Sequence, residues 1–134
     1  MPDVLVMRKI ESLQRCLKRI EEKIPLSAPA LASDLDAQDI ISVNLERAVQ
    51  QCVDAAMIVL SEADEPVPAT MSEAFEALAA AGVVSPETAG RMSKAVGFRT
   101  IAVHAYRKID WGIVWKIITE HLDDFRRFAR EITR

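Results

Sequence analysis

Apolar residues recur every three or four positions along most of this chain, and this period constrains the fold more than any other feature of the sequence. The first such stretch ends before Pro25 and covers a helix of about five turns. Its apolar positions are Val6, Ile10, Leu13, Leu17, Ile20 and Ile24. No stretch alternates convincingly with the period of two that a half-buried strand requires, so the pattern predicts helices throughout.

A second helix is expected from about residue 37 to residue 63, with Asp36 as its N-cap and Asp39 favouring its first turn. Its apolar face is formed by Ile41, Leu45, Ala48, Cys52, Ala55 and Val59. Beside that face runs a polar stripe at the same spacing, formed by Asn44, Arg47, Gln51 and Asp54. Such a stripe is either a solvated face or the lining of a cleft, and the pattern leaves both interpretations open.

Three more helices are marked by capping residues at their starts. Thr70 opens a short helix through a capping box with Glu73. Ser85 precedes a proline at the first helical position, and that helix is expected to continue into the segment around residue 104. Asp110 is expected to cap one long last helix. The apolar face of that helix is formed by Val114, Ile117, His121, Phe125, Phe128 and Ile132. His121 lies on this face without a basic partner, so we expect a structural role for it.

These segments predict an all-α bundle of about five helices that forms one domain over residues 1–134. A chain of this length buries enough surface to fold without disulfides or metals. Cys16 and Cys52 have no C-x-x-C spacing, so we expect two reduced, part-buried thiols. The near-heptad stripes at both ends of the chain suit a homodimer interface as well as a core, and the pattern does not separate the two.

The net charge and the hydropathy of the chain limit the kinds of partner that it can bind. The chain has 17 basic and 20 acidic residues and a net charge of −3, so a general basic coat for nucleic acid is excluded and an RNA would have to bind in a local cleft. No apolar run approaches the ~18 residues of a membrane span. The first residues lack the apolar core of a signal peptide. We therefore expect a cytoplasmic protein that is not associated with a membrane.

The segment from Phe98 to Tyr106 is the strongest candidate for chemistry. Arg99 lies on the apolar stripe of its helix, where a guanidinium is seldom placed without a partner or an anionic ligand. His104 follows five residues later, about 140° around an ideal helix. The two side chains can therefore face one cleft only if the helix ends or bends between them, or if two subunits form the cleft.

Histidine and arginine together suit the cleavage of RNA without a metal or another cofactor. His104 can take the proton from a ribose 2′-OH near neutral pH. Arg99 can stabilise the charge on the phosphate with its planar fork of donors. Tyr106, the only tyrosine in the chain, can donate a hydrogen bond to phosphate or ribose. A packed or solvated histidine that happens to follow an arginine remains the alternative at this point.

Arg99, His104 and Tyr106 together resemble the Arg-x4–6-His signature of the HEPN superfamily, in the Arg-x4-His-x-Tyr version of HepT-type toxins. The resemblance also covers NLERAVQQCVDAA (44–56), MSEAFEALAAAGVVS (71–85) and AVGFRTIAVHAYRKID (95–110), which occur in the family's order and spacing. It extends from about residue 39 to the C-terminus, while the first helix matches only in character.

The resemblance implies a helical bundle that dimerises and brings two Arg/His motifs into one cleft. It implies a metal-independent endoribonuclease acting on tRNA or mRNA, encoded beside an antitoxin that is a minimal nucleotidyltransferase of the MntA type. By position, Tyr106 is then the residue to which that antitoxin transfers AMP. Thr100 departs from the family, which usually has Asn after the arginine. Thr100, Arg47, Gln51 and Asp54 are implied to support the same cleft.

Two other functions remain open. The first is a HEPN module without catalytic activity that binds a nucleotidyltransferase partner or a nucleotide, and the acidic net charge and Thr100 favour it. The second is a plain helical dimerisation domain, which leaves the ordered match with the family unexplained. The complete set of arginine, histidine and tyrosine favours the ribonuclease.

Overall fold

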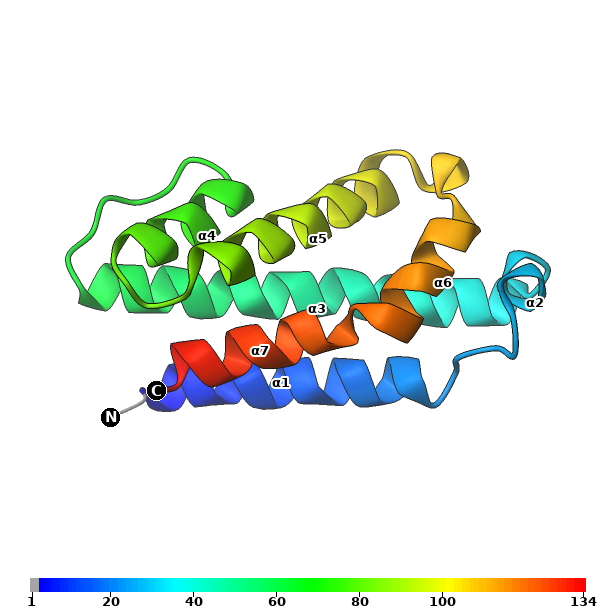
Figure 1. Ribbon diagram of the computed structural model, residues 1–134, viewed down its shortest axis with the longest axis horizontal. Helices are drawn as coiled ribbons and strands as arrows, with labels where there is room; N and C mark the ends of the chain where they lie inside the picture. The colour runs from blue at the N-terminus through cyan, green and yellow to red at the C-terminus, as the bar shows by residue number, and fades with distance from the viewer. Residues whose placement is uncertain (1–2) are drawn as a thin grey trace.

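The computed structural model describes residues 3–134, and this part of the chain folds into seven α-helices and one short 3-10 helix, without strands (Figure 1). The elements are α1 (Val4–Glu21), α2 (Ala28–Ala32), α3 (Leu35–Glu62), α4 (Met71–Ala80), α5 (Pro86–His104), η1 (Tyr106–Lys108), α6 (Trp111–Glu120) and α7 (Leu122–Ile132). The predicted all-α class is therefore confirmed. Among the residues described, no helix combines the length and the apolarity needed to cross a membrane.

The long helix α3 is the axis of the bundle (Figure 1). α1 packs along it on one side, and α4 and α5 pack along it on the other. α6 crosses one end of the bundle next to α2, and α7 then runs back against α1, α3 and α5. The C-terminal end of α5 therefore lies over the N-terminal part of α3, and this arrangement positions the candidate site.

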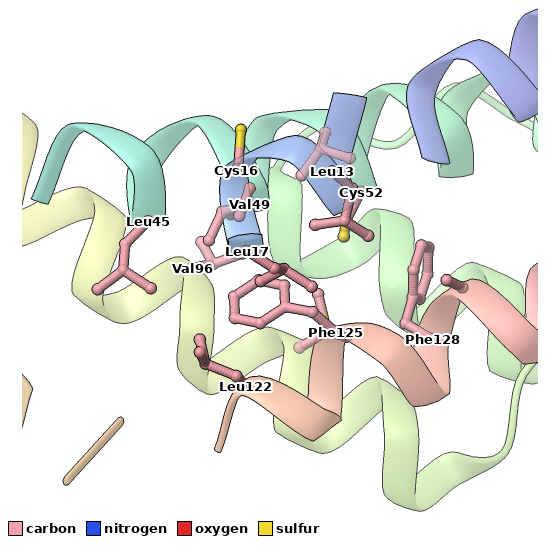
Figure 2. Close-up of a cluster of buried hydrophobic side chains, with 14 of the residues drawn as sticks. Leu13, Cys16, Leu17, Leu45, Val49, Cys52, Val96, Leu122, Phe125 and Phe128 are labelled. Carbon is pink, nitrogen blue, oxygen red and sulfur yellow. The ribbon is translucent and has the colours of Figure 1, made fainter. Parts of the chain in front are cut away.

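The core lies where α1, α3, α5 and α7 meet (Figure 2). Its side chains are predominantly aliphatic, and the labelled ones are Leu13, Cys16, Leu17, Leu45, Val49, Cys52, Val96, Leu122, Phe125 and Phe128. Phe128 also meets Phe75 of α4 edge-to-face, with ring centroids 5.5 Å apart. Both cysteines are free and buried, and burial raises the pKa of both thiols, which makes them poor nucleophiles.

The capping signals were predicted correctly at three helices. Thr70 accepts a hydrogen bond from the backbone N–H of Glu73 at 3.1 Å. Ser85 caps α5 through the N–H of Thr88, and Asp110 caps α6. Gly82 closes α4 with a φ of +77°, a backbone conformation that glycine adopts without strain.

The N-terminal half differs from the prediction in three respects. Asp34, and not Asp36, is the N-cap of α3 and accepts from the N–H of Ala37 at 3.0 Å. α1 ends at Glu21, and Ile24 packs against the core from the following turn. The expected connection contains α2, whose carbonyl groups at 31 and 32 accept hydrogen bonds from the buried Gln38 side chain at 2.9 and 3.1 Å. A spacing of three or four residues does not predict hydrogen bonds to carbonyl groups six and seven residues earlier.

The expected single last helix is wrong, because the chain breaks at His121 into α6 and α7. The backbone of His121 leaves the helical region, with φ −122° and ψ 5°. α6 packs against α2 with Val114 and Ile118 buried, whereas α7 packs against α1, α3 and α5. One straight helix could not reach both sets of partners. His121 is consequently half-exposed and lies 3.5 Å from Asp124, rather than on a buried face.

A buried carboxylate ties α7 to the start of α5. Glu131 is only 7% exposed, and it accepts hydrogen bonds from the Ser85 backbone N–H and the Thr88 hydroxyl. Arg127 lies 3.4 Å from the same carboxylate. Burial acts to raise the pKa of Glu131, but the hydrogen bonds and Arg127 outweigh it and lower the pKa below its ordinary value. The ionised form therefore stabilises the junction between the two helices.

Replacing Glu131 by Gln is expected to lower the free energy of unfolding at pH 7 by about 1.5–3 kcal/mol, the usual range for a hydrogen bond to a charged group. Because the folded pKa is lowered, this stabilisation is present above the ordinary glutamate pKa of about 4.3 and is lost as the pH falls through the folded value. Urea unfolding from pH 7 to pH 3 measures the difference, with the exposed Glu76→Gln as control. A difference that persists unchanged at pH 3 would contradict this assignment.

Candidate functional site

α5 carries both predicted catalytic residues on one unbroken helix. It runs from Pro86 to His104, and the backbone leaves it only at Ala105, with φ −148° and ψ 49°. No bend separates Arg99 from His104, so the two side chains leave the helix about 140° apart. A bend between the two residues is therefore absent, and a cleft between two subunits stays a prediction. The His104 side chain is exposed and takes part in no hydrogen bond or ion pair recorded within residues 3–134.

The guanidinium of Arg99 is partly buried without a full set of partners. Its Nε atom is buried and makes no hydrogen bond, and Arg99 forms no ion pair with any residue between 3 and 134. An unmade hydrogen bond on a buried charged group is costly. The rest of the half-buried guanidinium forms no ion pair within residues 3–134, so its accessible N–H groups can bind a phosphate group.

Thr100 follows Arg99, and its hydroxyl is bonded within α5. Its hydroxyl donates to the Val96 carbonyl in the preceding turn of α5, at 3.0 Å. The hydroxyl proton is thereby used within the helix. Thr100 therefore offers no free donor to the candidate site, in contrast to what its place in the motif led us to expect.

Tyr106 lies in η1, immediately after α5, and is held by two other elements. Its hydroxyl donates to Oδ1 of Asp39 on α3 at 2.9 Å, across 67 positions of sequence. Its ring meets Trp111 of α6 edge-to-face, with centroids 5.9 Å apart. Burial raises the pKa of Tyr106, and the carboxylates of Asp39 and Glu46 raise it further, although Ser42 acts in the opposite direction. The phenol is therefore neutral at physiological pH but remains 39% exposed.

Asp39 contacts Tyr106, and the sequence did not single it out as a site residue. Its position predicted only a favourable interaction in the first turn of α3, and this prediction is wrong, because α3 begins at Leu35 and its first turn contains Asp36 instead. Nothing in the local pattern links it to a tyrosine 67 residues away. Only the packing of the end of α5 over the start of α3 brings the two side chains together (Figure 1).

The polar stripe on α3 faces a different direction from Tyr106. Arg47, Gln51 and Asp54 lie roughly 80–140° around the helix from Glu46, a neighbour of Tyr106. Asp54 forms an ion pair with Lys9 of α1 at 3.2 Å. Arg47 is exposed, and its charge acts on the Cys16 thiol of α1. Within one chain the structure does not bring these three side chains to Tyr106.

A separate cavity of about 450 Å³ lies among α3, α5, α6 and α7. Its walls include Val49, Phe98 and Phe125, and Lys94 and Lys116 also line it. Arg99, His104 and Tyr106 do not line this cavity. In residues 3–134, no three His, Cys, Asp or Glu side chains are grouped so that they could hold a metal ion.

Comparison with known proteins shows which family this chain resembles. Residues 13–132 match the family model described as ribonuclease HepT-like. The chain is 29% identical over 124 residues to the mRNA nuclease HepT of Shewanella oneidensis, and the match covers 92% of each protein.

Two solved structures share this architecture closely. The first contains the tri-AMPylated Shewanella oneidensis HEPN toxin in complex with the MNT antitoxin; the TM-score is 0.91, with 28% identity over 98% of each chain. The second is a toxin–antitoxin structure with AMP-PNP, with a TM-score of 0.91 and 28% identity over 97% of this chain and 98% of that one. With nearly its whole length covered by the family model, this chain belongs to the ribonuclease HepT-like family.

Proposed function

We propose that this chain is a metal-independent endoribonuclease toxin, in which Arg99 and His104 cleave RNA at a cleft formed by two copies of the chain. The observation that carries the proposal is the buried, unpartnered Nε of Arg99, five residues before an exposed histidine, in a chain of the HepT-like family. The substrate class is tRNA or mRNA, and the relative from Shewanella oneidensis is an mRNA nuclease. Such a substrate places the action in the cytoplasm.

The two side chains divide the reaction between them. His104 takes the proton of a ribose 2′-OH, and the 2′-oxygen attacks the adjacent phosphorus. The bond from phosphorus to the 5′-oxygen breaks, and that oxygen takes a proton from water or from the histidine of the second copy. Arg99 binds the non-bridging oxygens while the negative charge on them increases. Cleavage of total tRNA in EDTA, by the parent and by variants at these two positions, tests the proposal.

The cleft requires a dimer, and the surface around His104 suits one. Apolar side chains beside it on α5 stay exposed, with Ile101 at 45% and Val103 at 47%. Covering these apolar side chains with a second copy of the chain removes them from water and stabilises the dimer. A C2 dimer whose axis passes beside this surface would also bring the Arg99 of one copy toward the His104 of the other.

We expect the chain to be a dimer by light scattering at micromolar concentration. Val103→Glu introduces a charge into the proposed interface and is expected to shift the protein toward the monomer and lower RNA cleavage with it. Val67→Glu is the matched control, because Val67 is 82% exposed in the loop between α3 and α4. A monomeric parent that still cleaves RNA would contradict the shared cleft.

The second part of the proposal concerns control of the nuclease. We propose that a nucleotidyltransferase antitoxin of the MntA type binds the chain and transfers AMP to Tyr106. Tyr106 is the only tyrosine of the chain, it is partly exposed, and the relative solved in complex with an MNT antitoxin is tri-AMPylated. The added phosphate brings bulk and negative charge beside the catalytic motif and excludes the RNA phosphate.

The alternative is a HEPN module that binds the nucleotidyltransferase or a nucleotide and cleaves nothing. Two observations favour it: the Thr100 hydroxyl is bonded within its own helix, and the net charge is −3. A parent protein that is unmodified, folded and inert on RNA would support this alternative.

A further inference from the structure

The hydrogen bond between Tyr106 and Asp39 gives the tyrosine a fixed direction. The hydroxyl of Tyr106 donates to Oδ1 of Asp39 at 2.9 Å, and the ring packs edge-to-face on Trp111. The contact joins η1 to α3, two elements that are far apart in the sequence. The phenolic oxygen of Tyr106 is therefore held in one position, although 39% of the residue is exposed.

The surroundings keep that oxygen protonated. Burial raises the pKa of Tyr106, and the carboxylates of Asp39 and Glu46 raise it further, while Ser42 on the same helix opposes them. Trp111 is the partner from α6 and carries no charge. A protonated phenol is a weak nucleophile, so a group transfer to this oxygen needs a base within hydrogen-bond reach.

We infer that Asp39 is the proton acceptor for the transfer of AMP to Tyr106, an assignment that rests on the regulation proposed above. The phenolic oxygen attacks the α-phosphorus of ATP and forms an oxygen–phosphorus bond. The bond from that phosphorus to the oxygen bridging to the β-phosphate breaks, and pyrophosphate leaves with the electron pair. The phenolic proton passes to the Asp39 carboxylate along the existing hydrogen bond. The chain thus supplies the base for its own modification, and the partner supplies the nucleotide.

The transfer of AMP to Tyr106 also removes its contact with Asp39. The ester oxygen of an adenylylated Tyr106 has no proton to donate, so the hydrogen bond to Asp39 is lost. The new phosphodiester carries negative charge beside the carboxylates of Asp39 and Glu46. This repulsion moves the modified side chain away from α3.

Asp39→Asn separates the base from the contact, because the amide oxygen still accepts a hydrogen bond but no longer takes a proton. Full-length parent and variant are incubated with ATP, Mg²⁺ and the nucleotidyltransferase of the proposed pair, and the added mass is followed over time. We expect the initial rate for Asp39→Asn to fall about 100-fold, the lower range for a general base. The control Asp36→Asn, at an exposed residue in the first turn of the same helix, keeps the parent rate.

The pH dependence distinguishes a base from a merely structural contact. The rate for Asp39→Asn is expected to rise as the pH increases and more phenolate forms, whereas the parent rate stays nearly flat. Tyr106 can be titrated by its ultraviolet absorbance because it is the only tyrosine, and its pKa should be lower in Asp39→Asn than in the parent.

Two outcomes would overturn the inference, and they differ in what else they affect. If the parent and Asp39→Asn gain AMP at equal rates, Asp39 is not the base, and the proposed function stands. If the parent gains no AMP at Tyr106, the proposed regulation fails together with the inference. The cleavage of RNA by the unmodified parent is measured separately and continues to test the nuclease.

Discussion

Alanine at His104 or at Arg99 is expected to lower RNA cleavage by at least about 100-fold, and the two changes together by little more than either alone. General acid–base catalysis contributes roughly 10²- to 10⁴-fold, and one donor to a developing oxyanion contributes about 10²- to 10³-fold. Residues that act as a unit are not additive, because removing either one disables the same step. Purified protein and total tRNA in EDTA give the measurement, and His104→Ala should also abolish growth inhibition in cells.

The chain offers a matched control for each residue. His121→Ala removes the other histidine, which lies at the junction of α6 and α7 beside Asp124. Arg130→Ala removes an exposed arginine from α7. Both controls should cleave at the parent rate, and circular dichroism should show unchanged helix content in all four variants. A fully active His104→Ala protein would contradict the catalytic assignment.

An inert parent has one further explanation to check before the nuclease is abandoned. Intact mass shows whether the purified chain already carries AMP on Tyr106. A modified and inert parent agrees with the proposal, and removing the modification should then restore cleavage. A parent that is inert without modification would favour the binding module.

Phe128→Ala is expected to cost about 3–5 kcal/mol of unfolding free energy, the largest stability effect of any single change considered for this chain. Phe128 lies fully buried in the core (Figure 2). Its ring meets Phe75 at 5.5 Å with the ring planes at 88° and so joins α7 to α4. Truncation removes the buried ring and leaves a cavity that close-packed neighbours fill only in part. Because a small domain is stable by about 5–15 kcal/mol, the variant should be partly unfolded at moderate urea concentrations.

Urea unfolding followed by circular dichroism measures this loss. Leu26→Ala is the control, since Leu26 is fully exposed in the connection before α2 and its truncation should change stability by no more than about 0.5 kcal/mol. A loss below about 1 kcal/mol for Phe128→Ala would mean that the ring is not packed as described.

Much of the fold was predictable from the sequence because its signals act over three or four residues. The spacing of apolar residues predicted the buried side of α1, including Val6, Ile10 and Leu13. Thr70 and Ser85 marked helix starts correctly, since an N-cap binds the N–H groups of its own first turn. The motif around Arg99 and His104 was also legible from the sequence, through its resemblance to the HEPN superfamily.

The tertiary structure alone decided the features that depend on distant partners. The break at His121 follows from the different packing partners of α6 and α7, and a continuous apolar stripe does not encode it. The hydrogen bond of Tyr106 with Asp39 joins residues 67 positions apart. Asp54 of the polar stripe forms its ion pair with Lys9 of α1, so this part of the stripe faces α1. Local periodicity fixes which side of a helix is apolar, but only the packing of helices against one another fixes which distant side chains meet.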